Sequence, residues 1–369
     1  MDKYLSKKIK IISFFSIIMV VLIHSYNMKD DFLNADTKIS DPFSITCFIE
    51  HFLSNGFTRV AVPFFFAISG YLFFVNFNPT IKGFLTKFKK RVNTLFIPHI
   101  LWSSVIMLFF LVLQSIRPLY LDFTGGAVSS YSFGKVIYTL VYNPISYQLW
   151  FTRDLIIYVI LTPIIYLAVS RLSYFAVAPF FIVWFLNINL VAVNNEGIFF
   201  FILGTFLAVK KKSWKREHNK LAVNILLASW IALLLVKTYM AFSSSFALLY
   251  MYKAAVILGM LSIWFAYDAY IGNVEENSRI FKFTPYTFFI FIFHVPLVDM
   301  LKVPLTSAFA SSIPAHLIIF IFASSFSIGL AIIVGILLNT YITPVFNLIT
   351  GGRGTAIFDK KITEVTRNL

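Results

Sequence analysis

The side chains that could do chemistry in this sequence are a few ionisable groups embedded in long apolar stretches. They are His24, Arg59, Arg153, Asp154, Lys253, His294 and Asp299. A charge at the centre of a membrane helix costs about 2.5–3.5 kcal/mol on insertion scales, so each group needs a partner or a function. A neutral imidazole can accept a proton at physiological pH and return it later. Two buried histidines on different segments therefore indicate a polar cavity for acid–base catalysis or for a proton relay.

Each of these groups also has a structural interpretation. A histidine in a polytopic protein is often a packed, hydrogen-bonded residue. Arg153 beside Asp154 can form a local ion pair, and pairing with Asp154 or Asp299 is the simplest role for Lys253. The sequence lacks the motifs required for a nucleophilic Ser or Cys, for a metal site or for nucleotide binding. Ser69 stands in the tripeptide ISG rather than in G-x-S-x-G, and His294 and Asp299 are spaced so that they diverge on a helix. We predict no metal and no bound cofactor.

Membrane helices must position these groups. The chain has 369 residues, of which 59% are hydrophobic and 13% charged, and its mean hydropathy is +0.82. Soluble domains carry about 25% charged residues, so an ordinary soluble globule is excluded. Because an isolated spanning segment must satisfy its own backbone hydrogen bonds, we predict an all-α, polytopic membrane protein with about ten spans. The predicted spans are residues 9–27, 60–77, 95–114, 149–168, 173–193, 197–209, 221–240, 246–267, 284–303 and 315–340.

The basic residues predict the orientation of these spans. The chain has 31 Lys and Arg against 16 Asp and Glu, a formal net charge of +15. With ten spans, 22 of the basic residues fall on the side of the N-terminus. Six fall on the opposite side: Lys29, Lys38, Arg117, Lys135, Lys237 and Lys302. By the positive-inside rule both termini lie in the cytoplasm, and the spread of charge over separate loops argues against nucleic-acid binding.

Two further features of the organisation follow from this topology. The segment 28–57, which includes Glu50, is expected to be an outer loop, and residues 346–369 a cytoplasmic tail after a transmembrane domain over 1–345. The basic segment 82–96 mixes aromatic and cationic residues, so we expect a short amphipathic helix on the inner leaflet. It could meet an anionic cytosolic ligand or anchor the chain to anionic lipid. Lys10 precedes His24 by 14 residues, which places both near one face of a helix.

Five segments resemble successive motifs of the membrane-bound acyltransferase-3 family. In chain order they are IISFFSIIMVVLIHSYN (11–27), RVAVPFFFAISGYLFF (59–74), KKRVNTLFIPHILW (89–102), LWFTRDLIIYVILTPI (149–164) and FFIFIFHVPL (288–297). Their order and spacing match the family over most of the chain. The resemblance implies a cytoplasmic-membrane enzyme that moves an acyl group, commonly acetyl from acetyl-CoA, onto a carbohydrate or another cell-envelope acceptor.

The resemblance also implies roles for single residues. His24 matches the first-span histidine considered essential for transfer. The other matching positions are Arg59, Pro63, Phe65, Ser69, Gly70, Arg91, Pro98, Trp102, Trp150, Phe151, Arg153 and His294. Several of these also have structural roles, such as close helix packing at Gly70. The family usually carries an arginine eleven residues before the histidine, where this chain has Ser13, and Lys10 could take over its phosphate-facing role.

The resulting hypothesis is a multi-pass O-acyltransferase of the cytoplasmic membrane, surrounded by lipid and compatible with a homo-oligomer. His24 would act as general base or acyl relay, Arg59, Arg153 and His294 would complete the catalytic set, and acetyl-CoA would be a co-substrate. Its phosphates would meet Lys10, Lys90 and Arg91, and the carbohydrate acceptor would meet Ser69 and Trp150. The alternative is a transporter or flippase of lipid-linked sugar that relays protons through buried His and Asp. A structural scaffold would leave the buried His and Arg unexplained.

Overall fold

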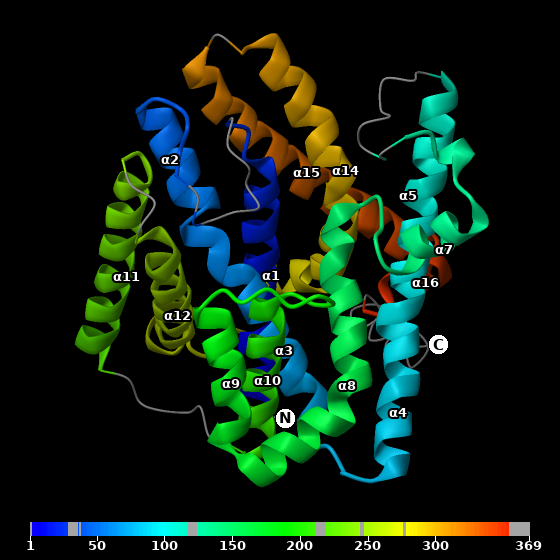
Figure 1. Cartoon of the computed structure of the whole chain (residues 1–369), viewed down its shortest axis with the longest axis vertical. Helices are drawn as coiled ribbons and strands as arrows, with labels where there is room; N and C mark the ends of the chain where they lie inside the picture. Colours follow the sequence, from blue (N-terminus) through cyan, green and yellow to red (C-terminus); the bar gives the residue numbers. More distant parts are fainter. Residues whose placement is uncertain are drawn as a thin grey trace, which may run out of the picture. The chain divides into compact units, whose positions relative to one another are not determined.

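The computed structural model describes residues 2–28, 36, 38–116, 124, 126–211, 219–243, 247–275, 278–310 and 312–353. All regular secondary structure in these residues is helical (Figure 1). Eight helical stretches are long and apolar enough to cross a membrane, and two apolar helices, α9 (Tyr174–Phe185) and α10 (Asn195–Val209), are shorter. These features confirm the predicted all-α, polytopic architecture. Lys29 and Arg117, two of the basic residues expected outside, lie beyond the described residues.

The chain divides into two compact units, each built from three stretches of sequence. Unit 1 contains residues 1–76, 165–287 and 297–330, and unit 2 contains residues 77–164, 288–296 and 331–369. Three long helices contribute to both units: α8 (Trp150–Leu172), α14 (Thr287–Ala308) and α15 (Ile313–Tyr341). The two units are described separately below.

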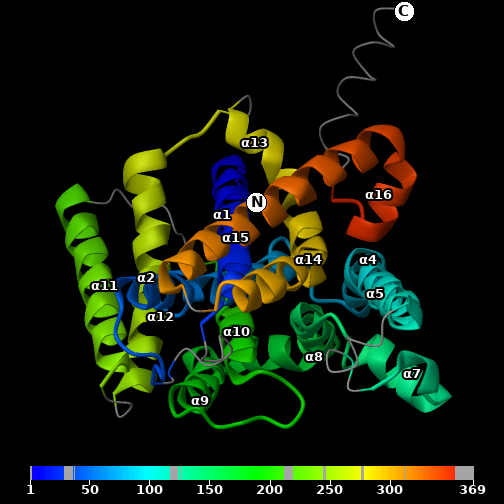
Figure 2. The same ribbon diagram turned by 90° about the horizontal axis from the view of Figure 1, so that it is seen from above.

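Unit 1 contains most of the helices. Besides α9 and α10 they are α1 (Lys3–Ser25), α2 (Ile45–Ser54), η1 (Phe57–Val60), α3 (Ala61–Phe74), α11 (Lys220–Ala241), α12 (Leu248–Ala266), η6 (Tyr267–Ile271), α13 (Arg279–Phe283) and η7 (Thr284–Tyr286). Asp2, Ser44 and Asn194 begin α1, α2 and α10, and each side chain accepts a backbone N–H of the first turn. The neighbouring helices α11 and α12 are clear in Figure 2.

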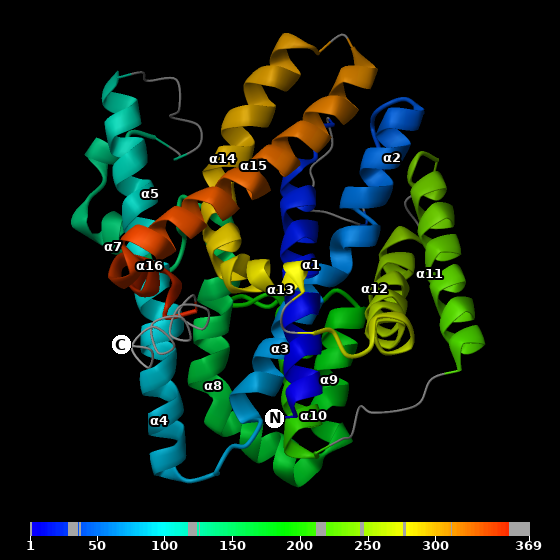
Figure 3. The same ribbon diagram turned by 180° about the vertical axis from the view of Figure 1, so that it is seen from behind.

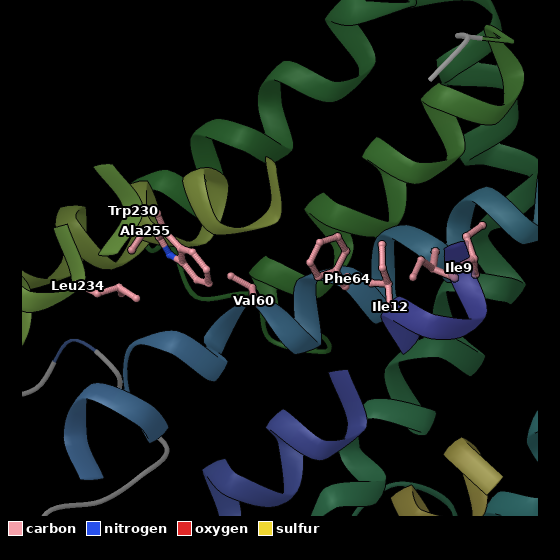
Figure 4. Packing of buried hydrophobic residues seen from close by; sticks show 8 residues of the cluster. Ile9, Ile12, Val60, Phe64, Trp230, Leu234 and Ala255 are labelled. Carbon is pink, nitrogen blue, oxygen red and sulfur yellow. The ribbon is translucent and has the colours of Figure 1, made fainter. Parts of the chain in front are cut away.

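Residues from four parts of unit 1 form a continuous apolar core (Figure 4). Ile9 and Ile12 come from α1, Val60 and Phe64 from η1 and α3, and Trp230, Leu234 and Ala255 from α11 and α12. Trp230 and Leu234 are at most 1% exposed. Because lipid tails are as apolar as these side chains, the core stabilises the unit through close van der Waals packing between helices. The core thereby fixes α1 and η1, which carry His24 and Arg59.

Two glycines allow α3 and α10 to approach each other at backbone distance. A Cβ atom on Gly70 would lie 2.1 Å from the carbonyl oxygen of Phe201, and one on Gly204 would lie 1.9 Å from that of Ala67. Any larger residue would force these helices apart. The expectation that Gly70 permits close packing is confirmed.

Unit 2 is built around one long helical run. Its elements are α4 (Ile81–Arg91), η2 (Val92–Phe96), α5 (Ile97–Ile116), η4 (Val128–Ser130), α7 (Phe133–Val141), η5 (Tyr147–Leu149), the first part of α8 and α16 (Thr343–Thr350). The basic segment is helical as predicted, but α4 passes through η2 into α5 without a loop, in one line (Figures 1 and 3). The helix expected over the basic segment is thus present, and it continues directly into the spanning helix α5.

The end of the chain also differs in detail from the expected division. Residue 346 lies inside α16, and Phe346 is fully buried against Phe289. Trp102 of α5 donates its indole N–H to the carbonyl of Ile349 at 3.2 Å. Residues 346–353 of the expected tail thus include a packed helix of unit 2, and residues 354–369 lie outside the described part of the chain.

Candidate functional site

His24 occupies the last turn of α1 and is 7% exposed. The last carbonyl groups of a helix have no hydrogen-bond donor within the helix. Here other elements of unit 1 supply the donors. Ser54 of α2 donates its hydroxyl to the carbonyl of Leu22 at 3.1 Å. The Lys302 ammonium, from α14, donates to the carbonyls of His24 and Tyr26. A cation at this position also complements the helix dipole, so the backbone that carries His24 is fixed from two sides.

Lys302 is itself buried at 8% exposure and lies 3.2 Å from Asp299, one turn earlier on α14. Lys302 was counted among the basic residues of the outer side, and it lies buried within α14, which continues to Ala308. The expected loop position of Glu50 is wrong, because α2 buries one face made of Thr46, Cys47, Glu50, His51 and Ser54. These residues, at spacings of one, three and four, lie on a single side of the helix.

Glu50 is the most deeply buried carboxylate near His24, with no exposed surface. The backbone of Asn27 and the Lys302 ammonium both favour the negatively charged form of its carboxyl group. Neither carboxylate oxygen makes a hydrogen bond of ordinary length with the described residues. A buried carboxylate with such spare capacity can accept a proton or a hydrogen bond from a ligand.

Arg59 lies on η1 and is half-buried. Its Nε donates to the carbonyl of Ser54 at 3.0 Å, and its Nη2 donates to the side-chain oxygen of Asn55. Lys237 of α11 donates to the backbone carbonyl of Asn55 at 2.9 Å and is 1% exposed. Lys237 was also counted among the basic residues of the outer side, and it continues the buried stripe of Trp230 and Leu234 on α11. Unit 1 thus brings His24 and Arg59 onto elements joined through Ser54.

Lys253 of α12 does not take the expected partners. Its ammonium is 3.5 Å from the side-chain oxygen of Asn187 and 4.9 Å from the Trp184 ring centroid. Two carboxylates act on its charge: Glu196, which accepts hydrogen bonds from Trp184 and Tyr252, and Asp36. The expected pairing with Asp154 or Asp299 is replaced by this group around α9 and α10.

Two of the basic residues near the N-terminus of α1, Lys8 and Lys10, differ in burial. Lys8 is 1% exposed, and its Nζ lies 2.7 Å from both carboxylate oxygens of Asp268 and 3.7 Å from the Trp264 ring centroid. Lys10 is exposed, with its Nζ 6.0 Å from the Phe281 ring centroid. Both residues, Lys10 and His24, lie on the uninterrupted helix α1, as the expected common face requires, but only His24 is buried.

A cavity of about 220 Å³ lies beside this end of α1, within unit 1. Its walls come from α1, α3, α10 and α12 and include Leu5, Ile9, Phe64, Leu203 and Trp264. The walls are almost entirely apolar, so the cavity offers no group for acid–base chemistry. Ser69, the predicted acceptor-binding residue of α3, is half-buried and does not line it.

In unit 2, Arg153 and Asp154 form the local ion pair that their adjacency allows. The guanidinium lies 2.8 Å from the Asp154 carboxylate and 4.9 Å from the Tyr142 ring centroid, and it donates to the Tyr142 carbonyl. Asp154 is fully buried and also accepts the hydroxyl of Tyr158 at 3.3 Å. Trp150, the first residue of α8, is half-buried against Phe151. These contacts hold Arg153 at the start of α8 with 20% of its side chain exposed.

His294 lies in unit 2 where α14 departs from helical geometry. Val295, the next residue, has φ −108° and ψ 130°. The break frees backbone carbonyls, and Gln148 donates its side-chain amide to those of Ile292 and Val295, both at 3.3 Å. His294 is fully buried, and its Nδ1 lies 3.0 Å from the carbonyl of Ile290. Because a carbonyl only accepts, Nδ1 donates, and Nε2 is the acceptor of the neutral ring.

The two predicted donor-binding residues of α4 differ in exposure. Lys90 is exposed, whereas Arg91 is half-buried. The positive charge of Arg91 repels that of Arg353. The Arg353 guanidinium lies 3.8 Å from the Phe288 ring centroid in the same unit. Burial and then the charge of Arg91 lower the pKa of Arg353. Two neighbouring guanidinium groups of like charge favour an anion beside them.

The structure therefore distributes the predicted site residues over both units. Unit 1 holds His24, Arg59, Ser69 and Lys10, and unit 2 holds Arg153, His294, Trp150, Lys90 and Arg91. Sequence reasoning missed Glu50, His51, Lys237 and Lys302 as buried groups. Helical spacing could have indicated Lys237, three residues after Leu234 and four before the buried Ala241. Among the described residues, no three His, Cys, Asp or Glu side chains are placed to hold a metal ion.

Comparison with known proteins identifies relatives of the chain. A family model described as an acyltransferase domain, Acyl_transf_3, matches residues 8–339. The chain is also 28% identical over 178 residues to the succinoglycan biosynthesis protein ExoH of Rhizobium meliloti (strain 1021). That alignment covers 46% of this chain and 45% of the relative, so the chain matches less than half of that protein's length. No solved structure gives a significant match.

Proposed function

This chain belongs to the acyltransferase-3 family, and on that premise we propose that it transfers an acyl group, acetyl in the first instance, from acyl-CoA to a hydroxyl of an envelope polysaccharide or its precursor. Family membership makes the chain an acyltransferase, and its long apolar helices make it a multi-pass membrane protein. The polysaccharide acceptor is supported by the relative in succinoglycan biosynthesis. We place the reaction in the cytoplasmic membrane.

The observation that carries the proposal is the environment of His24. A histidine that only packs needs no special backbone support, but Lys302 and Ser54 hold the last turn of α1 through its carbonyls. Glu50, a buried carboxylate with unused hydrogen-bonding capacity, lies on the neighbouring α2. Fixed geometry beside proton-accepting groups is what general base catalysis requires.

The chemical step follows from these groups. The imidazole of His24 removes the proton from the acceptor hydroxyl, and the oxygen attacks the thioester carbonyl carbon of acyl-CoA. The carbon–sulfur bond then breaks, and the leaving thiolate of CoA takes the proton from the His24 imidazolium. Arg59, in the same unit as His24, stabilises the developing oxyanion or holds a polar group of the substrates. Ser69, also in unit 1, contacts the acceptor. For Arg153, His294 and Trp150, which lie in unit 2, the family resemblance alone supports the proposed roles.

Each unit has exposed basic residues that are candidates for the donor phosphates. Lys10 is exposed near the N-terminus of α1, and Lys90 is exposed on α4 beside Arg91. We add Arg353 to this set because its charge and that of Arg91 repel each other until an anion binds. Substituting Lys10 or Lys90 should therefore raise the KM for acyl-CoA while leaving kcat nearly unchanged.

A reconstitution experiment tests the proposal. The purified chain in liposomes is given radiolabelled acetyl-CoA and an extract of envelope glycans, and label in the glycan fraction is counted. We expect His24→Ala to lower transfer by about 10²–10⁴-fold. His316→Ala, which removes a half-buried histidine of α15 in the same unit, is the matched control and should retain activity.

Two outcomes would contradict the proposal. Transfer by His24→Ala at the wild-type rate would remove the assigned role of His24. Movement of glycan across the liposome membrane without acyl-CoA, and with no label transferred, would favour the transporter alternative.

A further inference from the structure

A second group of polar side chains in unit 1 surrounds Asn55, where α2 ends and η1 begins. We define the Asn55 cluster as His51, Asn55, Arg59 and Lys237. Asn55 is 1% exposed, and it accepts hydrogen bonds from two cations that come from different elements. Lys237 of α11 donates to its backbone carbonyl and Arg59 of η1 to its side-chain oxygen. The proposed transfer step uses only Arg59 of this cluster.

The hydrogen bonds around Asn55 determine the proton position on His51. Arg59 has donors only, so the side-chain oxygen of Asn55 must face it and the amide nitrogen must face His51. That nitrogen lies 3.2 Å from Nδ1 of His51. Because an amide NH₂ donates, Nδ1 accepts, and Nε2 carries the proton of the neutral ring. His51 is 2% exposed, and its Nε2 has no hydrogen-bond partner among the described residues.

Lys237 adds further unused donors. An ammonium group has three N–H donors, and within the described part of the chain Lys237 makes one hydrogen bond and no ion pair. Asp36 acts on its charge only at longer range. The next residue, Thr238, has a fully buried hydroxyl that also lacks a partner in the described residues. The charges of Lys237 and Arg59 both act on His51, so these groups are neighbours.

These groups share a chemical preference. Lys237, Arg59 and the Nε2–H of His51 can only donate. Burying the Lys237 cation, which makes no ion pair with the described residues, is costly, and an anion that accepts hydrogen bonds from Lys237 and His51 would offset that cost. A carboxylate or phosphate group has this property, and charge-assisted hydrogen bonds to it are strong.

The position of the cluster indicates which substrate would carry the anion. Ser54, immediately before Asn55, bonds to the carbonyl of Leu22, so the cluster lies near the C-terminal end of α1. Lys10, proposed to meet the CoA phosphates, lies about 18 Å away along the helix axis, at 1.5 Å per residue. We infer that the Asn55 cluster binds an oxyanion, carboxylate or phosphate, carried by the saccharide acceptor. This inference rests on the proposed function for the identity of the acceptor.

A binding experiment without acyl donor tests the inference. The thermal unfolding of the full chain in detergent is followed with glucuronate, glucose 1-phosphate or glucose, at constant ionic strength made up with sodium chloride. We expect at least one acidic sugar to raise Tm by a few degrees, since a ligand that binds only the folded state stabilises it. Glucose should give no shift. Glucuronate and glucose 1-phosphate distinguish a carboxylate from a phosphate ligand.

Variants then locate the binding site. Lys237→Met should weaken binding of the acidic sugar at least about tenfold, the effect of losing one charge-assisted hydrogen bond. Lys253→Met, which removes another buried lysine of unit 1, is the matched control and should bind as the wild type does. If Lys237→Met does not fold, His51→Phe tests the same site by removing the Nε2–H donor, and Lys237→Arg should retain binding.

Three results would overturn the inference: no Tm shift of the wild type with either acidic sugar, an equal shift with glucose, or undiminished binding by the Lys237 and His51 variants. The test is independent of catalysis. If glucuronate binds through Lys237 but no acyl transfer occurs, the proposed function fails and the anion site remains. If transfer occurs and depends on His24, but neither acidic sugar binds, the anion site fails alone.

Discussion

The two ends of α1 both meet a buried lysine, but they differ in how completely their polar groups are satisfied. At the N-terminal end, Lys8 contacts both oxygens of Asp268 and the face of Trp264. At the C-terminal end, Lys302 supports the backbone of His24, while Glu50 nearby keeps unused acceptors. A saturated ion pair can serve stability alone. Unused buried groups lower stability, so their presence indicates that the C-terminal end is shaped for a ligand.

The largest expected effect is a loss of stability when the Lys8–Asp268 ion pair at the N-terminal end of α1 is broken. Lys8→Met leaves the Asp268 carboxylate without its cation, and removing one partner of a buried pair costs about 3–5 kcal/mol. We expect a large fall in Tm or in the yield of folded protein, measured by thermal unfolding and size-exclusion chromatography in detergent. The double variant Lys8→Met with Asp268→Leu should recover most of the loss. A single variant as stable as the wild type would show that this end is not structural.

A smaller effect is expected from weakening the support of His24. Lys302→Met removes the donor to the His24 and Tyr26 carbonyls, so the imidazole should lose its fixed position. We expect kcat to fall about 10–100-fold, with little change in KM, because misplacement by an ångström costs up to about that factor. Lys302→Arg, which restores the cation, should recover part of the rate. Unchanged kcat in Lys302→Met would rule out the positioning role.

The smallest effect, and the sharpest distinction between the two ends, is expected from Glu50→Gln. This change keeps the shape of the side chain and replaces a buried carboxyl group that makes no hydrogen bond of ordinary length with the described residues. Tm should stay the same or rise, whereas transfer should fall by roughly tenfold if the carboxylate assists the proton movement of His24. Thermal unfolding and the reconstituted transfer assay measure the two quantities on one preparation. A fall in Tm without a fall in activity would make Glu50 a structural residue.

Much of the fold and part of the site could be predicted from the sequence. Long apolar stretches predict helices because a membrane leaves the backbone no other partner, and the close packing at Gly70 and the pair of Arg153 with Asp154 are confirmed. The acyltransferase-3 resemblance, based on five motifs, is confirmed by the family match. The motif residues predict the family because each motif combines residues typical of its chemistry with residues that determine the local helix structure.

The buried polar groups near His24 could not be found in the same way. Residues 45–54 are too few and too polar for a predicted span, so α2 and its Glu50 were assigned to a loop. Lys302 stands next to the predicted end of a span, where hydropathy does not separate an interior cation from an interfacial one. Among the described residues, Lys302 donates to backbone carbonyls nearly three hundred residues away in the chain. Such contacts follow from tertiary packing, which local pattern does not encode.

One packing feature has a practical use for membrane topology. Cys47, the chain's one cysteine, is 1% exposed and packs in unit 1 against Ile39, Ala241 and Leu248. A thiol reagent that cannot cross a bilayer should therefore leave the wild-type chain unlabelled. Single cysteines at the exposed positions Lys10 and Lys135 would then report their side of the membrane directly. With the N-terminus in the cytoplasm, intact cells would label the second and spare the first.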